Sequence, residues 1–430
     1  MEKHILSKST FIKGYHCLKS LYLHKKRPFL RDRLTAEQLA KFKRGHRVGD
    51  LAQQLFPGGI DVSPKSPSQY QKSAIRTAEL IASGQEVIYE ATFQYDKVLI
   101  MLDLLVKTNT GWEAYEVKSS KSLSETYMTD AALQYYVITQ SGLELSSFYL
   151  VYVDEHYHFE NQLELDQYFI KKEVTSELIE KQDFIAVKIS EEMAMLQEDH
   201  SPKVAVGDHC FSPYKCDFVG FCWKRIKDKP YMPSSFSLKG LFPKSDNDIE
   251  VLSFIFSEQA VPECENEKTY FQKCIGFKVG DADAVISGKS CEEKQDFIQS
   301  FFEQIDISKP YLTFDKYLMS AWLKDALLQL PEFKAKVEYL NQHTMGLMDI
   351  IIEKELIELK TKNLYSLAFL SKTHLDDDSF SKAAIASDIL ATALFEKMED
   401  TLWGDDSPDM DTLKHFLHMK QSLSKELYKL

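Results

Sequence analysis

Acidic and basic side chains interrupt two neighbouring apolar segments in the first half of the chain. Asp103 lies inside one apolar run, and Glu116 and Lys118 lie two residues apart in the next. Residues two apart in a strand point to the same face, and the Asn-Thr-Gly sequence at residues 109–111 is typical of a hairpin turn. We therefore expect two paired strands that bring Asp103 beside Glu116, with Lys118 on the same face.

Such a group of charges suits a divalent cation. Carboxylate oxygens are the ligands that Mg²⁺ and Mn²⁺ prefer, and a carboxylate between leucines, as Asp103 is, needs a partner or a metal. Lys118 could orient an attacking water or stabilise charge on a phosphate oxygen. In the helix that follows, Asp130 and Gln134 share a face, so Gln134 could bond that water or the substrate. The alternative is a solvated ion-pair patch, the common role of an isolated Glu-x-Lys pair.

The hydrophobic pattern around these residues predicts a mixed sheet with helices, and hence an α/β domain. A linker rich in Pro, Ser and Lys is expected at 227–248, which separates a domain at 1–226 from a second domain at 249–430. In the first domain we expect helices at 7–26, 36–56, 70–84, 127–141 and over much of 163–197, and strands at 86–95, 98–107, 112–118 and 147–154.

Four of the seven cysteines form a second candidate site. Cys210, Cys216 and Cys222 are separated by two gaps of five residues, and Cys17 is the natural fourth ligand. Four thiolates suit either Zn²⁺ or an iron–sulfur cluster, and they would staple the first helix to the end of the domain. Buried thiols without metal are the alternative. That simpler role is expected for the remaining cysteines, Cys264, Cys274 and Cys291.

Charge is distributed unevenly along the 430 residues. The net charge is −13, but residues 1–50 carry 13 Lys or Arg against four acids, which gives +9 there and −22 in the rest. A local basic face attracts a phosphate backbone even on an acidic protein. The apolar content of 44% indicates a globular core. With no apolar run that could span a membrane and no signal-peptide pattern, we expect a cytoplasmic protein without membrane contact.

The order of these residues resembles a known nuclease family. His46, Asp103, Glu116-Val117-Lys118 and Gln134-Tyr135-Tyr136 are similar to the motifs of the RecB-type branch of the PD-(D/E)XK nucleases. The four cysteines resemble the iron–sulfur staple of the CRISPR-associated RecB-like exonucleases and of the AddB helicase-nuclease subunit, although the family more often has a shorter first gap. The resemblance covers about residues 5–225.

The resemblance implies a restriction-endonuclease-like sheet flanked by helices and a Mg²⁺- or Mn²⁺-dependent deoxyribonuclease. His46, Asp103, Glu116 and the Val117 carbonyl would bind the metal, and Lys118 would be the catalytic lysine. Additional site residues would be Gln134 and Tyr136, which support substrate or water, and Glu90 in a supporting role.

The same resemblance gives roles to the cysteines and to the basic first helices. Cys17, Cys210, Cys216 and Cys222 would hold a [4Fe–4S] cluster, with Zn²⁺ as the alternative. The DNA backbone would be gripped by basic residues, and Tyr15 and Tyr22 would be available to stack on bases. The basic residues are Lys13, Lys19, Lys25, Lys26 and Arg44.

The second domain resembles, more faintly, the RNase H-like DEDD exonucleases, as found in an uncharacterised bacterial family that fuses such a domain to a RecB-like module. Glu258 and Asp388 match two of the motif acids. Phe256 and Met319 stand where the other two acids would be, and Ala383 replaces the general-base histidine. Because two-metal chemistry needs its acids, we expect an inactive binding or assembly module. An unrelated α/β domain is the alternative.

The leading hypothesis is therefore a DNA nuclease, expected to act as an exonuclease on single-stranded or frayed DNA in repair or defence. The rival from another class is a non-catalytic nucleic-acid-binding or assembly protein that uses the same fold, with a protein partner at the acidic second domain. An RNA-directed nuclease is a third possibility. Exonuclease versus endonuclease action, the direction of digestion, the biological pathway and the oligomeric state do not follow from the sequence.

Overall fold

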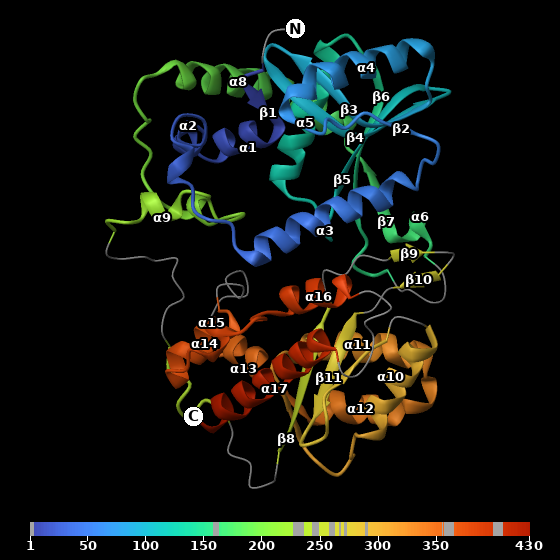
Figure 1. The fold of residues 1–430 in the computed structure, drawn as a ribbon, viewed down its shortest axis with the longest axis vertical. Helices are drawn as coiled ribbons and strands as arrows, with labels where there is room; N and C mark the ends of the chain where they lie inside the picture. Colours follow the sequence, from blue (N-terminus) through green and yellow to red (C-terminus); the bar gives the residue numbers. More distant parts are fainter. Residues whose placement is uncertain are drawn as a thin grey trace. The chain divides into compact units, whose positions relative to one another are not determined.

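The structure is a computed structural model in which the chain forms two compact units (Figure 1). The first consists of Met1–Thr35, Phe42–Tyr157 and Glu164–Tyr231, and the second of Ala36–Lys41, His158–Leu163 and Met232–Leu430. The residues that the structure describes are 4–157, 163–226, 236–242, 249–257, 263–265, 268–270, 273–288, 291–354, 356, 365–398 and 407–430.

The first half of the chain alternates strands and helices. The strands are β1 (Leu6–Ser7), β2 (Ile60–Asp61), β3 (Val87–Tyr95), β4 (Val98–Thr108), β5 (Gly111–Lys118), β6 (Leu145–Val153) and β7 (Phe169–Glu173). The helices are α1 (Lys8–His16), α2 (Leu18–Lys26), α3 (Ala36–Gln53), α4 (Tyr70–Ser83), α5 (Glu125–Gln140), α6 (Leu165–Tyr168), α7 (Thr175–Glu180), α8 (Gln182–Gln197) and α9 (Val219–Cys222), with short 3₁₀ turns η1 (Pro28–Leu30), η2 (Pro67–Gln69) and η3 (Asp208–Cys210).

These strands form one mixed sheet in the order β2-β3-β4-β5-β6-β7, and β1 also pairs with β4. The pairs β3–β4, β4–β5 and β6–β7 are antiparallel, whereas β2–β3, β5–β6 and β1–β4 are parallel. The predicted α/β class, with a mixed sheet flanked by helices, is confirmed. The predicted hairpin between β4 and β5 is confirmed as well, and Gly111 at its end has φ +138°, a conformation that favours glycine.

Strand β4 changes partner at Asp103. On one edge, Val98 and Leu99 pair with β1, whereas Leu104 and the residues after it pair with β5. Asp103 lies at this fork, directly beyond the last pair of the β4–β5 ladder. There a side-chain hydrogen bond replaces the backbone ladder: the Asp103 Oδ2 accepts a 2.6 Å hydrogen bond from the Val117 backbone N–H. The fork therefore opens a polar position between strands that are otherwise apolar.

The neighbouring strand β3 is irregular at the same level. Glu90 has φ +55°, which is unfavourable for a residue with a side chain, and it is skipped in the β3–β4 pairing between Tyr89↔Leu104 and Ala91↔Leu102. Core residues on β3 accordingly step from Ile88 to Ala91, three positions instead of two. Strain of this kind concentrates at functional sites, and here it lies beside the fork.

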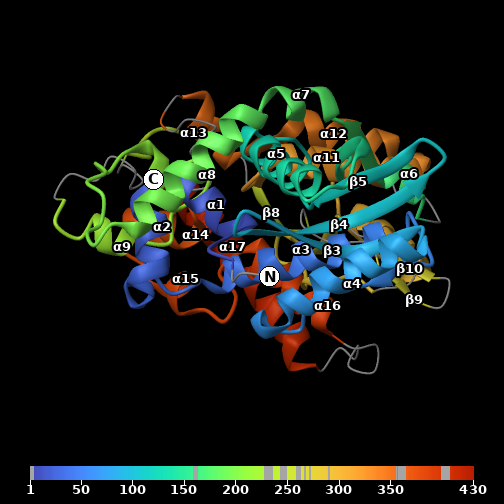
Figure 2. The same cartoon turned by 90° about the horizontal axis from the view of Figure 1, so that it is seen from above.

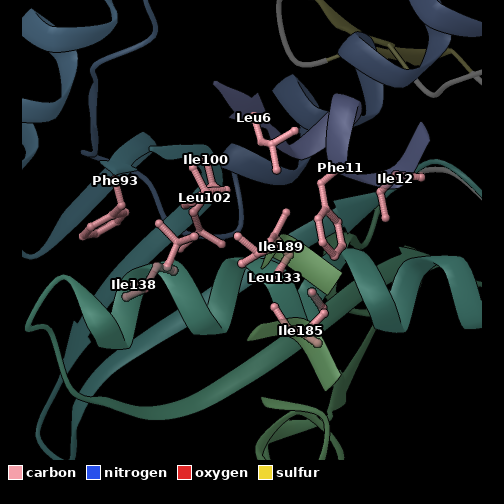
Figure 3. Close-up of a cluster of buried hydrophobic side chains, with 14 of the residues drawn as sticks. Leu6, Phe11, Ile12, Phe93, Ile100, Leu102, Leu133, Ile138, Ile185 and Ile189 are labelled. Carbon is pink, nitrogen blue, oxygen red and sulfur yellow. The ribbon is translucent and has the colours of Figure 1, made fainter. Parts of the chain in front are cut away.

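The core of the first unit lies between the sheet and the helices on one side of it. Helix α5 packs against β3, β4 and β6, and Figure 2 shows it extended along the sheet. Figure 3 shows Phe11 of α1 together with Leu133 of α5 and Ile189 of α8, with Leu6 of β1 above them. The N-terminal segment is thus part of the core, because Leu6 of β1 and Phe11 of α1 are both buried in it.

Two predicted elements differ from the structure. The helix expected over residues 7–26 is two helices, α1 and α2, because Cys17 between them has an extended backbone (φ −163°, ψ 111°). Within the segment expected to be helical after residue 163, Phe169–Glu173 is the edge strand β7, paired with β6. Phe169 and Ile170 favour a strand, but the helical pattern of the residues on either side led to the prediction of a continuous helical segment.

Glu192 of α8 is a buried carboxyl group in this core. Its side chain is 0% exposed and neither oxygen has a hydrogen-bond partner within the described part of the chain. It lies against α1 where Gly14 lacks a side chain: a Cβ atom there would be 2.3 Å from the Glu192 Cδ. Burial raises the pKa of Glu192 to about 9, so the folded protein keeps this group protonated at neutral pH.

This shift predicts a pH dependence of stability. The unfolded chain releases the Glu192 proton near its ordinary pKa of 4.5 and the folded chain only near 9, so stability from this group is full below 4.5 and is lost as pH rises towards 9. Glu192→Gln cannot titrate. We expect its free energy of unfolding to fall less between pH 5 and pH 8 than that of the wild type, by about 4 kcal/mol.

Urea unfolding at several pH values measures this difference. Glu191→Gln is the matched control, because Glu191 is the exposed neighbour on the same helix and pairs with Lys188 at 2.7 Å. Equal pH dependence in the wild type and Glu192→Gln would show that Glu192 is ionised in the folded protein.

The second unit is also α/β. Its strands are β8 (Glu250–Phe256), β9 (Glu263–Glu265), β10 (Lys268–Tyr270), β11 (Cys274–Val279), β12 (Val285–Ile286), β13 (Tyr311–Thr313) and β14 (Thr344–Gly346). The helices are α10 (Cys291–Glu303), α11 (Lys316–Gln329), α12 (Lys334–His343), α13 (Leu347–Glu353), α14 (Leu367–Leu375), α15 (Ser379–Lys382), α16 (Asp388–Lys397) and α17 (Pro408–Lys429), with the 3₁₀ turn η4 (Pro331–Phe333).

Its main sheet has the order β12-β11-β8-β13-β14 and is covered on both faces. Val251 and Ile255 of β8 belong to a core with α17, and Phe254 and Phe256 belong to another with α10 and α11. Figure 1 shows α17 crossing β8 and β11. Residues 236–242, inside the predicted linker, pack into this unit, because Leu238 and Phe242 are buried in the core with α17.

No helix among the described residues has the length and apolarity needed to cross a membrane.

Candidate metal centre

Asp103, Glu116 and Lys118 converge at the fork of β4, as their spacing predicts. Asp103 is the residue directly across from Glu116 beyond the pair Leu104↔Tyr115. Lys118 lies two residues further along β5, and its Nζ is 2.7 Å from the Glu116 Oε1. The Glu116 side chain is only 2% exposed, so this is a buried ion pair and not the solvated patch that was the alternative.

A second acid holds Lys118 from the helix side. Asp130 of α5 accepts a hydrogen bond from the Lys118 Nζ, and the ammonium also lies 5.1 Å from the centre of the Tyr127 ring. Although burial opposes ionisation of Lys118, Asp130 and Glu116 raise its pKa above the ordinary value. The catalytic candidate is thus held in its charged form between two carboxylates, one on β5 and one on α5.

The two strand carboxylates differ in their protonation. Burial raises the pKa of Asp103 well above its ordinary range, and the nearby charge of Glu116 raises it further. Burial also opposes ionisation of Glu116, but Lys118 and Lys8 outweigh it and hold its pKa well below the usual range. Two adjacent carboxyls with opposite shifts are typical of functional sites, since like charges in one site resist joint ionisation.

The donor set fits a hard cation in its chemistry. Asp103 and Glu116 offer carboxylate oxygens, and the Glu116 Oε2 is buried without a hydrogen-bond partner in the described structure. An orphaned buried carboxylate oxygen is costly and marks a place where a ligand is expected. Taken over the described residues, however, no three His, Cys, Asp or Glu side chains converge closely enough to form a complete metal-binding group.

His46, predicted as a metal ligand, does not join the two carboxylates. It is exposed on α3 and, within the described chain, makes no hydrogen bond or ion pair with them. The helix itself is fixed beside the site, because the guanidinium of Arg44 donates to the Ser119 carbonyl just after β5. Arg44 is therefore an anchor of α3, a different role from the predicted contact with DNA.

Glu90, predicted in a supporting role, lies close enough to affect the site's electrostatics. Burial raises the pKa of Glu90 to about 7, with Lys8 opposing the rise and Glu116 adding to it. Asp61 and Asp50 contribute as well, so the end of α3 adds negative charge to this region. Glu90, Asp103 and Glu116 consequently form a row of acids across β3, β4 and β5.

The predicted residues of α5 divide into two groups. Gln134 is fully buried, and neither atom of its amide has a hydrogen-bond partner in the described structure, so it retains free donors and an acceptor. Tyr136 is partly exposed and packs edge-on against Tyr95 at 6.0 Å between ring centres. Burial raises the pKa of Tyr136. Gln134 keeps its candidate role, whereas Tyr136 has a packing role in this structure.

The four predicted cysteines are neighbours in space although Cys17 is 193 residues before Cys210 in the sequence. Burial raises the pKa of Cys17 and of Cys222, and the other cysteines of the group raise both further, which places all four thiols within electrostatic range. The thiols are free, and Cys216 Sγ donates to the Ser20 hydroxyl at 3.5 Å. Within the described residues, these thiols do not reach metal-ligating geometry.

Contacts other than sulfur also join the first helices to the cysteine segment. Asp217 Oδ2 is 2.6 Å from the Lys13 Nζ and 3.1 Å from the Arg31 Nη2. The Asp32 carboxylate accepts a hydrogen bond from the Gly220 N–H at 2.9 Å, and a Cβ atom at Gly220 would be 2.4 Å from Asp32 Oδ1. The predicted connection between α1 and the end of the unit therefore exists independently of any bound metal.

These contacts revise the predicted nucleic-acid residues. Lys13 is committed to Asp217, and Lys19 lies near Cys222, whose pKa it lowers. Lys25 and Lys26 are exposed at the end of α2. The stacking role expected for Tyr22 is wrong, because its ring is buried and its hydroxyl donates to the Asp199 carbonyl at 2.7 Å. The large exposed aromatic in this segment is Phe29, which is 77% exposed.

In the second unit, one predicted acid is already neutralised. Both carboxylate oxygens of Asp388 accept hydrogen bonds from the Lys420 Nζ at 2.9 Å, and Lys420 also donates to the Phe254 carbonyl at 2.6 Å. Phe256 and Met319, which stand where acids were expected, are buried in the core, and Ala383 ends helix α15. Glu258 lies outside the described residues.

Sequence reasoning missed one residue of the candidate metal centre, Lys8. Its Nζ is 2.7 Å from the Glu116 Oε1, the oxygen that Lys118 also binds. Nothing in the local pattern distinguishes Lys8 from the other lysines of the basic segment, because its position depends on the pairing of β1 with β4.

No family model and no curated protein matches the chain. Among solved structures, one described as the crystal structure of SSO0001 is similar to it at 11% sequence identity. The similarity covers 53% of this chain and 89% of that chain, with a TM-score of 0.27. A TM-score this low supports no conclusion about fold or function.

Proposed function

We propose that the first unit is a metal-dependent nuclease that hydrolyses phosphodiester bonds of single-stranded DNA. The observation that carries the proposal is the convergence of Asp103, Glu116 and Lys118 at the fork of β4. Two buried carboxylates side by side are costly without a cation, and a charged lysine next to them suits a substrate that develops negative charge. The resemblance of these motifs to RecB-type nucleases agrees with this chemistry.

Asp103 and Glu116 would hold Mg²⁺ or Mn²⁺, together with the Val117 carbonyl. When bound, such a cation supplies an activated water and polarises a phosphate oxygen. Lys118, kept charged by Asp130 and Glu116, would stabilise the negative charge that builds on the phosphate. The amide of Gln134 has unused hydrogen-bonding groups with which to orient a water or the substrate.

Substrate binding is proposed to involve the end of α2 and the segment after it. Lys25 and Lys26 are exposed there, and Phe29 offers a ring on which a base can stack. A strand held by charge and stacking is single-stranded or frayed, and we propose exonuclease action from the resemblance of the motifs to RecB-like exonucleases. The four cysteines would hold a [4Fe–4S] cluster or Zn²⁺ as a structural staple, and the second unit would bind a protein partner.

The test is incubation of end-labelled single-stranded DNA with the full chain, in Mn²⁺ or Mg²⁺ and in EDTA, with duplex DNA and single-stranded RNA in parallel. The proposal predicts products from single-stranded DNA only when metal is present. Binding without products in either metal would favour the non-catalytic rival, which one observation also supports: Lys8 and Lys118 already compensate the charge of Glu116. Products from RNA alone would indicate an RNA-directed nuclease.

A further inference from the structure

The pairing of β1 with β4 and the start of α1 position Lys8 beside the proposed metal centre. Leu6 and Ser7 form β1, which pairs in parallel with Val98 and Leu99 of β4. Ser7 then caps α1 through Thr10, whose side chain accepts from the Ser7 backbone N–H at 2.7 Å, so Lys8 is the first helical residue. β1 ends at Ser7, paired with Leu99, four residues before Asp103 on β4, and the side chain of Lys8 extends from there to Glu116.

The contact that Lys8 makes there duplicates that of Lys118. Both Nζ atoms lie 2.7 Å from the same oxygen of Glu116, and the second oxygen of this carboxylate has no partner in the described structure. Asp130 and Asp103 also attract the Lys8 ammonium. One oxygen of the Glu116 carboxylate therefore pairs with two ammonium groups, while the other oxygen accepts no hydrogen bond within the described structure.

The two lysines differ in how firmly they are held. Lys118 has a second partner, Asp130, and its side chain is 13% exposed. Among the ion pairs of the described residues, Lys8 has one, with Glu116, and its side chain is 29% exposed. Lys8 can therefore withdraw towards solvent, whereas removal of Lys118 would leave the buried Asp130 carboxylate without this ion-pair partner.

We propose that Lys8 is the resident counter-ion of the metal-free centre, and that a divalent cation binds Glu116 in competition with it. This inference rests on the metal centre of the proposed function. Lys8 is then a positioning residue: it stabilises the buried carboxylates when no metal is present and sets how tightly the metal is held. A lysine that serves only as a surface ion pair would affect neither property.

The test is Mn²⁺ binding to the full chain by calorimetry, with Lys8→Met and Lys8→Arg compared with the wild type. We expect the Kd for Mn²⁺ to fall about tenfold in Lys8→Met, since a unit charge a few ångströms away changes cation binding by at least this factor even when water screens it. Lys8→Arg keeps the charge, and its Kd should stay near the wild-type value.

Thermal unfolding supplies a second measurement that needs no cleavage. In EDTA, Lys8→Met should lower Tm by about 4 °C, because Glu116 loses one of its two cations; saturating Mn²⁺ should restore most of it. Lys13→Met is the matched control on the same helix: it removes an ion pair of 2.6 Å, with Asp217, but should leave the Kd for Mn²⁺ unchanged.

Unchanged or weaker Mn²⁺ binding in Lys8→Met, with normal binding in the wild type, would overturn the inference alone. Absence of Mn²⁺ binding in the wild type would overturn the metal centre, and with it both this inference and the proposed function. If Lys8→Met is too unstable for calorimetry, the Mn²⁺ dependence of Tm in Lys8→Gln gives the same comparison.

Discussion

Lys118→Ala is expected to lower the rate of single-stranded DNA cleavage by about a thousandfold at saturating metal. The Lys118 ammonium is held by a strand carboxylate, Glu116 at 2.7 Å, and by a helix carboxylate, Asp130. Its loss removes the preorganised positive charge next to the phosphate. Cleavage is followed with labelled DNA, and DNA binding in EDTA should be nearly unchanged because the exposed basic residues remain.

The structure adds a complication that the sequence does not show. Removing Lys118 leaves the buried carboxylate of Asp130 without its ion-pair partner, which destabilises the fold by about 2 kcal/mol. The double variant Lys118→Ala/Asp130→Asn removes that charge too. We expect it to regain stability without regaining cleavage, which separates catalysis from folding. Lys121→Ala, at an exposed lysine nearby, is the control; full activity in Lys118→Ala would refute the assignment.

Cys17→Ser is expected to abolish binding of the proposed cofactor and to weaken the first unit. A cluster held by four thiolates stabilises the fold by its binding free energy, so one lost ligand should cost about 3–5 kcal/mol. Protein purified without oxygen should lose absorbance at about 400 nm if the cofactor is an iron–sulfur cluster. Colourless protein with one bound zinc per chain, lost in the variant, would identify the metal as Zn²⁺.

Cys274→Ser is the matched control for this experiment. Cys274 is fully buried in the second unit, with its thiol 3.4 Å from the Gly276 carbonyl, so its replacement should cost stability without changing metal content. Wild-type protein without iron or zinc would contradict the staple. In that case the ion pairs of Asp217 and the hydrogen bond of Asp32 would still connect the N-terminal segment to the cysteine segment.

Local pattern sufficed for the parts of the site that lie on one hairpin. Two strands and a tight turn dictate that Asp103 faces Glu116, and period-two alternation puts Lys118 on the same side. The helix with Gln134 follows from its apolar periodicity, although the burial of its amide without partners does not.

Other features of the site depend on contacts between residues far apart in the sequence, which the local pattern does not predict. Lys8 enters the site because a two-residue strand pairs with β4, and so short a strand has no periodicity to detect. The positive φ of Glu90 cannot be predicted from a sequence that is typical of a β-strand. The break at Cys17 and the burial of Tyr22 likewise depend on how α1 and α2 pack, since a single amphipathic helix has the same pattern of apolar residues.

The most direct test of the metal centre is a crystal structure of the full chain soaked in Mn²⁺, with anomalous diffraction measured at the manganese edge. We predict a peak between the carboxylates of Asp103 and Glu116, next to the Val117 carbonyl, and its loss in Asp103→Asn. With Mn²⁺ bound there, the Lys8 ammonium should have left Glu116. No peak at this position in the wild type, with Lys8 and Lys118 both still on Glu116, would contradict the proposed centre.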